Sequence, residues 1–124
     1  MANEFWLEAT MIEYNIIEDQ TAAIIYYAGV ASKPREKKLA NKLESINYQI
    51  GKGHPIISRK VSADTIQRIK DWKTRRNDSV HKACYTTFDE DNFRAISEEG
   101  KELVSMISND SQKVKRADEK GLKL

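Results

Sequence analysis

Apolar residues recur at helical spacing along most of this chain, and this periodicity constrains the fold more than any other feature. The clearest stripe steps by three and four residues along one helical face. Its members are Phe93, Ile96, Gly100, Leu103 and Ile107. Alternating patterns of the kind that indicate strands are absent, apart from the short segment 55–61, which cannot build a sheet. The sequence therefore predicts an all-α fold, a four- to five-helix antiparallel bundle.

The N-terminal segment from Glu4 to about Val30 is expected to form one long helix. Apolar residues recur along it at steps of three, four and seven, and this stripe is expected to face the core. The stripe consists of Phe5, Ala9, Ile12, Ile16, Ala23 and Tyr27. Ile17, Ile24 and Ala28 widen it in the second half, which is expected to be the more deeply buried. The nearly apolar run 21–31 is about half of the roughly 20 residues that a membrane span needs, so no membrane partner is expected.

Two further helices are expected in the middle of the chain. Ser32 can cap the first of them, with Pro34 in its first turn. Its inward residues are Leu39, Leu43, Ile46 and Ile50. His54 follows in a loop and is expected to be an exposed turn residue. Ser62 can cap the next helix. The buried side of that helix is expected to consist of Ile66, Ile69 and either Trp72 or Lys73.

The end of that helix is open to two interpretations. Asn77 and Asp78 favour caps and turns over helix interiors, so they can start a separate fourth helix. The residues then expected to face inward are Val80, Ala83, Cys84 and Phe88. A continuous helix with a kink at Asn77 fits the sequence equally well.

A final helix is expected after the acidic segment 89–91. Gly100 in its interior costs about 1 kcal/mol relative to alanine, so we expect this glycine to permit a close approach to another helix. The apolar pattern fades from Asp110 onward. We therefore expect one helical-bundle domain over residues 1–110 and a basic, mobile C-terminal tail over residues 111–124.

Composition and charge indicate a cytoplasmic protein with one unusual segment. A single cysteine excludes an internal disulfide and suits a reducing compartment, and the first eight residues carry no lysine or arginine of a signal peptide. Residues 1–32 contain five acids and no lysine or arginine, whereas residues 52–82 contain nine bases and three acids. This basic segment indicates either a solvated helix surface or a site for a polyanion.

The basic segment contains a cluster with chemical potential, formed by Arg75, Arg76, Asn77, Asp78 and His81. A guanidinium group holds a phosphate through two parallel hydrogen bonds, and a neutral imidazole exchanges a proton with a hydroxyl near neutral pH. These two groups suffice for metal-independent RNA cleavage, in which the 2′-hydroxyl attacks its own phosphate. If Asn77 or Asp78 caps a helix, His81 falls in its first turn. There the helix macrodipole keeps the ring available as a base and attracts phosphate.

Simpler interpretations of the same residues stay open. Arg-Arg-Asn-Asp at a helix junction is also typical of a solvated turn, and a lone histidine near apolar positions is commonly satisfied by a backbone carbonyl. Cys84 would make a Cys–His pair with His81, but its place on the predicted apolar face favours a structural cysteine. Two histidines and one cysteine without ligand spacing predict no metal site, and no motif predicts a cofactor.

The segment from Arg76 to His81 resembles the motif of the HEPN superfamily (higher eukaryotes and prokaryotes nucleotide-binding). That motif is an arginine, four to six residues and then a histidine, often with Asn or Asp directly after the arginine. Arg76 fits with four intervening residues and Arg75 with five, and we prefer Arg76 because Asn77 follows it. The resemblance covers Ser62 to about Ile107 in pattern, and the whole chain in length and number of helices.

The resemblance implies an all-α bundle that pairs as a homodimer with both motifs facing one cleft. Many members of the superfamily are metal-independent ribonucleases that act as toxins or in phage defence, whereas others only bind. It implies that His81 is the acid and base, that Arg76 is the phosphate ligand, and that Asn77 and Asp78 are orienting groups. Further substrate contacts are expected from Arg75, Lys82, Tyr85 and Lys73.

The expected function is therefore an endoribonuclease that acts on RNA. An antitoxin or a nucleotidyltransferase is the expected kind of protein partner. One alternative is a non-catalytic module that binds a nucleotide, an RNA or a protein. Another is a structural subunit in which Arg76 and His81 only tie a helix junction together.

Overall fold

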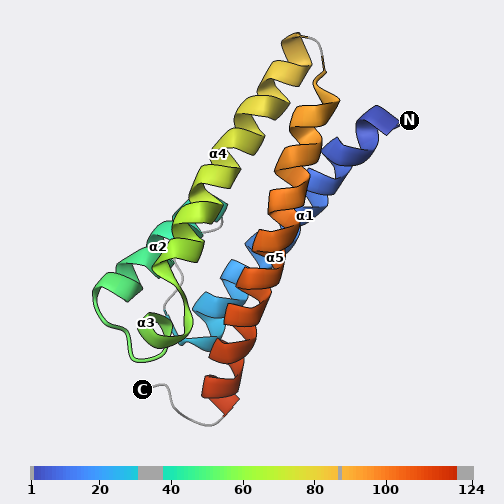
Figure 1. The fold of residues 1–124 in the computed structure, drawn as a ribbon. Helices are drawn as coiled ribbons and strands as arrows, with labels where there is room; N and C mark the ends of the chain where they lie inside the picture. Colours follow the sequence, from blue (N-terminus) through green and yellow to red (C-terminus); the bar gives the residue numbers. More distant parts are fainter. Residues whose placement is uncertain (1, 31–37, 87, 120–124) are drawn as a thin grey trace.

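The chain folds into a bundle of α-helices, which confirms the predicted all-α class (Figure 1). The computed structural model describes residues 2–30, 38–86 and 88–119, and none of these residues lies in a strand. The helices are α1 (Ala2–Tyr27), α2 (Leu39–Gly51), α3 (Ile57–Lys60), α4 (Ala63–Tyr85) and α5 (Glu90–Glu119). Within these described ranges, no helix has the length and apolar character needed to cross a membrane.

The three long helices form the body of the molecule, and α2 and α3 cover one end (Figure 1). α4 and α5 make an antiparallel hairpin. α1 runs in the same direction as α5, and these two helices share the most extensive packing in the molecule. Glu13 pairs with Ser97, and Tyr27 lies against Lys115 further along both helices. Because α1 packs along α5 and makes few contacts with α4, the C-terminal half of α4 packs mainly against α5.

The buried face of α1 differs from the predicted stripe. Phe5 and Ile12 are 58% and 59% exposed. The rest of the stripe is half-buried, namely Ala9, Ile16, Ala23 and Tyr27. Ile17, Ile24 and Ala28, which were expected to widen the stripe, are buried as predicted, and Thr10 and Thr21 lie with them on the face that packs on the bundle. Its threonines tolerate burial because their hydroxyls donate to backbone carbonyls one turn earlier, at 2.7 and 2.8 Å. The prediction is therefore wrong for Phe5 and Ile12, and it missed the two buried threonines because threonine is not an apolar residue.

The middle of the chain follows the prediction with one correction. Leu39, Leu43 and Ile46 are buried on α2 as expected, and the predicted cap at Ser32 and Pro34 lies outside the described residues. His54 is half-buried rather than exposed. Its Nδ1 atom accepts the backbone N–H groups of Ile56, the residue before α3, and of Ile57, the first residue of α3, each at 3.2 Å.

α4 is one continuous helix, so the alternative of a separate helix starting at Asn77 or Asp78 is wrong. The predicted cap at its start is confirmed, because the Ser62 hydroxyl accepts the backbone N–H of Thr65. Asn77 and Asp78 are exposed on the helix surface and cap nothing. Beyond them, Ser79 still contacts α5 through a hydrogen bond to Asn92, which keeps the helix on its packing surface.

α5 continues past Asp110 to Glu119, so the predicted tail does not begin at residue 111. Ser111, Val114 and Ala117 are buried and extend the apolar stripe with small side chains. These turns pack beside the end of α1, where the Lys115 ammonium lies 5.7 Å from the centre of the Tyr27 ring. The last five residues of the predicted tail lie outside the described ranges.

The three long helices meet at Trp72, which is fully buried. Its indole N–H donates to the carbonyl oxygen of Ile96 at 2.8 Å and fixes α4 to α5. Gly100 lies beside this ring. A Cβ atom at Gly100 would lie 2.5 Å from Glu13 Oε1 and 2.7 Å from Trp72 Cζ2, which confirms the predicted close approach.

Substituting Gly100→Ala should therefore destabilise the protein. Overpacking costs about 1–3 kcal/mol, which outweighs the roughly 1 kcal/mol that alanine gains in a helix interior. Urea unfolding of Gly100→Ala should show a loss of about 1–2 kcal/mol. Gly51→Ala is the matched control, because no atom lies within 4 Å of a Cβ added there. A Gly100→Ala protein as stable as the wild type would contradict this packing.

Candidate functional site

The motif residues lie in the C-terminal half of α4. His81 is one turn before the end of the helix and not in a first turn. The negative end of the helix macrodipole is the nearer one at this position. The predicted helix N-terminus, with its preference for a neutral imidazole and for phosphate, is therefore absent around His81. Any site at this position depends on side chains.

Arg76 is held by an aromatic ring and an amide. Its guanidinium lies 4.6 Å from the centre of the Tyr14 ring on α1, and its Nη1 atom donates to Asn77 Oδ1 at 2.9 Å. Among the described residues, its Nε atom is buried without a hydrogen-bond partner, and no carboxylate lies within ion-pair distance of the side chain. Burial lowers the pKa of Arg76, and the nearby Tyr14 partly opposes that shift. Arg76 is thus a half-buried cation without a carboxylate partner.

Arg75 is in a different state from its neighbour. It is exposed and forms an ion pair with Glu99 on α5. Arg68, two turns earlier on α4, pairs with Glu99 at 3.7 Å and with Glu102 at 3.3 Å. The charge of Arg75 is therefore already engaged within the protein. Of the two arginines that fit the motif spacing, Arg76 is the one available to an external anion.

His81 is exposed on the outer side of α4, and its ring centre lies 5.0 Å from that of Tyr85 one turn later. Asn77 and Asp78 lie one turn before it on the same side. Arg76 and His81 are five positions apart in the sequence, which places them about 140° apart around the helix. The two motif residues therefore do not converge within a single chain. Asn77 lies between them, because it bonds Arg76 and is four residues from His81.

Burial decides one other expectation near the motif, the one for Cys84. Cys84 is exposed, so its predicted role as a buried structural cysteine is wrong, because the helix turns that position away from α5. Lys73 is half-buried, whereas Lys82 and Tyr85 are exposed. Within the described part of the chain, no group of three or more His, Cys, Asp or Glu residues is placed to hold a metal ion.

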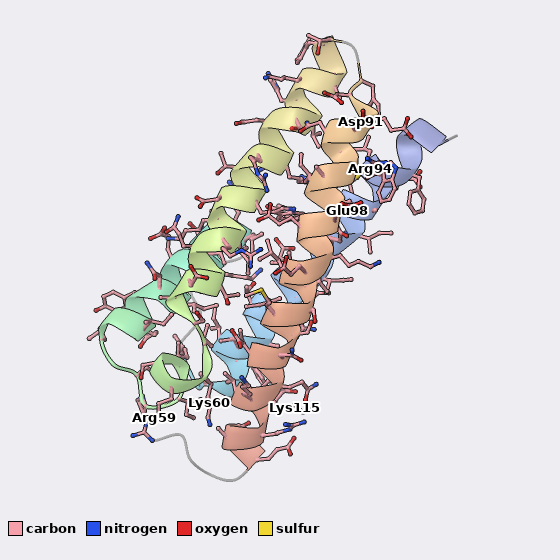
Figure 2. The ribbon with its side chains drawn as sticks, in the orientation of Figure 1. Arg59, Lys60, Asp91, Arg94, Glu98 and Lys115 are labelled. Atoms are coloured by element: carbon pink, nitrogen blue, oxygen red, sulfur yellow. The ribbon has the colours of Figure 1, made fainter. Side chains whose placement is uncertain are left out.

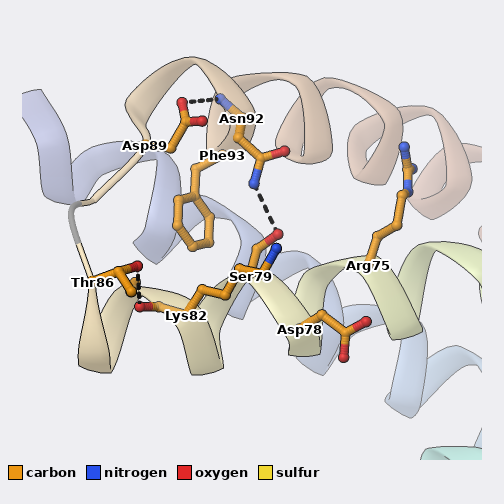
Figure 3. Close-up of a pocket in the computed structure, with 9 residues that line it drawn as sticks. Arg75, Asp78, Ser79, Lys82, Thr86, Asp89, Asn92 and Phe93 are labelled. Carbon is orange, nitrogen blue, oxygen red and sulfur yellow. Dashed lines mark hydrogen bonds between the residues drawn. The ribbon is translucent and has the colours of Figure 1, made fainter.

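A cavity of about 490 Å³ lies between the end of α4 and the start of α5 (Figure 3). It brings together Arg75, Asp78 and Lys82 of the predicted site residues and adds Asn92 from α5. Most of its other polar groups bond one another. Asn92 donates to Ser79 at 2.8 Å, the Thr86 hydroxyl donates to the Lys82 carbonyl, and Asp89 caps α5. Figure 3 shows the Asp78 carboxylate pointing away from α5. The cavity offers the Lys82 ammonium at its edge but no converged set of reactive groups.

Glu13 and Tyr14 on α1 are the residues that the sequence reasoning missed. Glu13 Oε2 accepts the Ser97 hydroxyl at 3.1 Å, while its Oε1 atom is buried with no partner among the described residues. Burial raises the pKa of Glu13 to about 7, and the Ser97 hydrogen bond and the charge of Lys101 oppose that shift. A signal existed in the sequence, because both residues fall within one turn of Ile17 on the face of α1 that is buried.

No protein-family model, no curated protein and no solved structure matches this chain. The function must therefore be argued from the side chains.

The raised pKa of Glu13 predicts that stability depends on pH. The folded-state value of about 7 lies above the ordinary 4.5, so the protonated carboxyl is favoured by folding. Its stabilising contribution is complete below about pH 4.5 and is lost as the pH rises through about 7. As the pH rises from about 4.5 to about 7, the urea midpoint of the wild type should decrease. Glu13→Gln should flatten this slope of the midpoint against pH. Asp19→Asn, an exposed change on the same helix, is the control and should keep the slope. An unchanged slope in Glu13→Gln would contradict the assignment.

Proposed function

We propose that this protein is a metal-independent endoribonuclease of the kind suggested by its resemblance to the HEPN superfamily. The observation that carries the proposal is Arg76, a half-buried cation with no carboxylate partner among the described residues, on the same helix as the exposed His81. Guanidinium groups in proteins are normally paired when they are partly buried. An arginine kept without a carboxylate is suited to an anion that comes from outside, such as an RNA phosphate.

The proposed reaction uses an internal nucleophile of the RNA. His81 takes the proton of a 2′-hydroxyl, the 2′-oxygen bonds to the adjacent phosphorus, and the bond from phosphorus to the 5′-oxygen breaks. A proton returned by an imidazole to the departing 5′-oxygen completes the step. The products are a 2′,3′-cyclic phosphate and a 5′-hydroxyl end. Arg76 stabilises the charge that develops on the phosphate, and Asn77 and Asp78 orient the groups.

A homodimer is part of the proposal, because one chain does not bring Arg76 and His81 together. α1 carries an exposed group of residues that we call the α1 patch, consisting of Phe5, Glu8, Met11 and Ile12. This patch lies at the same end of the bundle as the C-terminus of α4 (Figure 1). The N-terminal segment 1–32 contains acids and no lysine or arginine, whereas α4 is rich in bases. A two-fold axis can therefore pair α1 of each copy with α4 of the other, attractively on both sides.

The proposed setting is a cytoplasmic toxin or antiphage effector, with an antitoxin or nucleotidyltransferase as its protein partner. A cytoplasmic ribonuclease of this kind needs an inhibitor until it is required.

The cleavage proposal is tested with purified protein and single-stranded RNA in EDTA. Wild-type protein should cleave the RNA, and His81→Ala and Arg76→Ala should each slow cleavage by at least about 100-fold. Thermal melts should show that both variants remain folded. Arg59→Ala is the matched control, since Arg59 is exposed at the opposite end of the bundle (Figure 2). Wild-type rates in the His81 and Arg76 variants would refute the assignment.

The proposed dimer is tested by exchanging charges. Glu8→Lys and Lys82→Glu should each weaken the dimer by at least about tenfold, because like charges then face each other. An equal mixture of the two variants should restore it, since one interface regains a Lys–Glu pair and the other keeps its original pair. Light scattering after size exclusion measures both effects. A monomeric wild type, or no rescue on mixing, would exclude this interface.

A second candidate function is non-catalytic binding of RNA or a nucleotide. The separation of Arg76 from His81 around α4 favours it, because binding needs the cations and no convergent histidine. It predicts salt-sensitive RNA binding without turnover, weakened by Arg76→Ala and unchanged by His81→Ala. The His81 variant therefore separates the two functions.

A further inference from the structure

The Arg76 guanidinium is supported by a residue from the other end of the chain. Tyr14 lies on α1, and its ring is half-buried between the Arg76 guanidinium at 4.6 Å and the Trp72 ring at 6.4 Å. The planes of the two aromatic rings differ by 32°. The Tyr14 ring therefore contacts the Arg76 guanidinium and also lies beside the indole of Trp72 in the core.

This support differs in kind from those of the other arginines on α4. Arg68 and Arg75 are held by carboxylates of α5, which fix the side chain and cancel its charge. An aromatic ring attracts a cation through its quadrupole and carries no net charge. Burial raises the pKa of the Tyr14 phenol, so the ring stays neutral at physiological pH. Arg76 is thus fixed in position while its charge remains uncancelled.

Contacts with α4 and α5 fix the position of the Tyr14 ring. Trp72 is fully buried and bonded to the Ile96 carbonyl. Glu13, next to Tyr14 in the chain, bonds Ser97 and lies against Gly100. These contacts fix this turn of α1 on α4 and α5. Asn77 holds the other side of the guanidinium through its Nη1 atom.

We propose that Tyr14 is a positioning residue that holds the Arg76 guanidinium as an uncancelled cation for an RNA phosphate. This inference rests on the proposed ribonuclease function and extends it to a residue outside the motif. The alternative is a purely structural role, in which Tyr14 only fills space beside Trp72. The two differ in whether the aromatic face or merely the side-chain volume matters.

The experiment compares variants of Tyr14 that keep or remove the aromatic face. Tyr14→Phe keeps it, whereas Tyr14→Leu removes it and Tyr14→Met fills the gap with a flexible chain. In a His81→Ala background, which cannot cleave, the affinity for a short mixed-sequence RNA is measured by fluorescence anisotropy. Tyr14→Phe should bind like its parent, while the Leu and Met variants should bind about 3- to 30-fold more weakly. In an Arg76→Ala background, the same changes at Tyr14 should have no further effect.

Cleavage by the single variants completes the test. Wild type and Tyr14→Phe should cleave alike, and Tyr14→Leu and Tyr14→Met should be slower by a similar factor as in binding. Melting curves identify any variant that is unfolded, and the Met variant replaces the Leu variant in that case. If the wild type shows cleavage that depends on His81 but the Leu and Met variants equal it, the inference fails alone. If the wild type shows no such cleavage, the proposed function fails and this inference fails with it.

Discussion

The indole of Trp72 is the contact on which the arrangement of the long helices depends. Its N–H bonds the Ile96 carbonyl, so α4 cannot slide along α5 without leaving a buried donor unpaired. Its ring edge lies 2.7 Å from the place of a Cβ atom at residue 100, so a side chain larger than that of glycine is unfavourable there. Tyr14 approaches it from α1. One buried side chain therefore sets the positions of three helices and, one turn further along α4, the position of Arg76.

The distribution of ion pairs on α4 separates cations with an internal role from a cation without one. Arg68, Lys70 and Arg75 have carboxylate partners on neighbouring helices. These exposed pairs add little to stability, but they occupy the charges involved. Arg76 lacks such a partner among the described residues, although it is more buried than Arg75. Burial disfavours the charged form of Arg76 and lowers its pKa, and the nearby Tyr14 only partly opposes that shift.

The sequence predicted what depends on local periodicity and missed what depends on packing between helices. The inward residues of α2 and α5 and the cap at Ser62 were correctly predicted, because each follows from local spacing and hydrogen bonding. The prediction for α1 was right for Ile17, Ile24 and Ala28 but wrong for Phe5 and Ile12, because this helix is apolar on two sides and only the position of α5 decides between them. Its threonines were overlooked because their hydroxyls bond within the helix.

In the candidate site, too, local spacing predicted some features and packing between helices decided the others. The residue types of the motif could be recognised from the sequence, but the directions in which their side chains point could not. Whether Asn77 starts a helix or continues one changes the side on which His81 lies, and packing of α4 on α5 settles it. The distinction between Arg75 and Arg76 depends on Glu99 and Tyr14, which are distant in the sequence. Neither partner could be identified without the fold.

The parallel pairing of α1 with α5 has a consequence for how the chain acquires its structure. The Glu13–Ser97 contact joins residues 84 positions apart, and the most extensive helix packing in the molecule has this long range. The α4–α5 hairpin is local in sequence, but the core that includes α1 can close only when the last helix has left the ribosome. The high contact order of this pairing makes it a late and slow event in folding. Until then both apolar faces of α1 are open to solvent. In the newly made chain, the Arg76 guanidinium also lacks its contact with the Tyr14 ring.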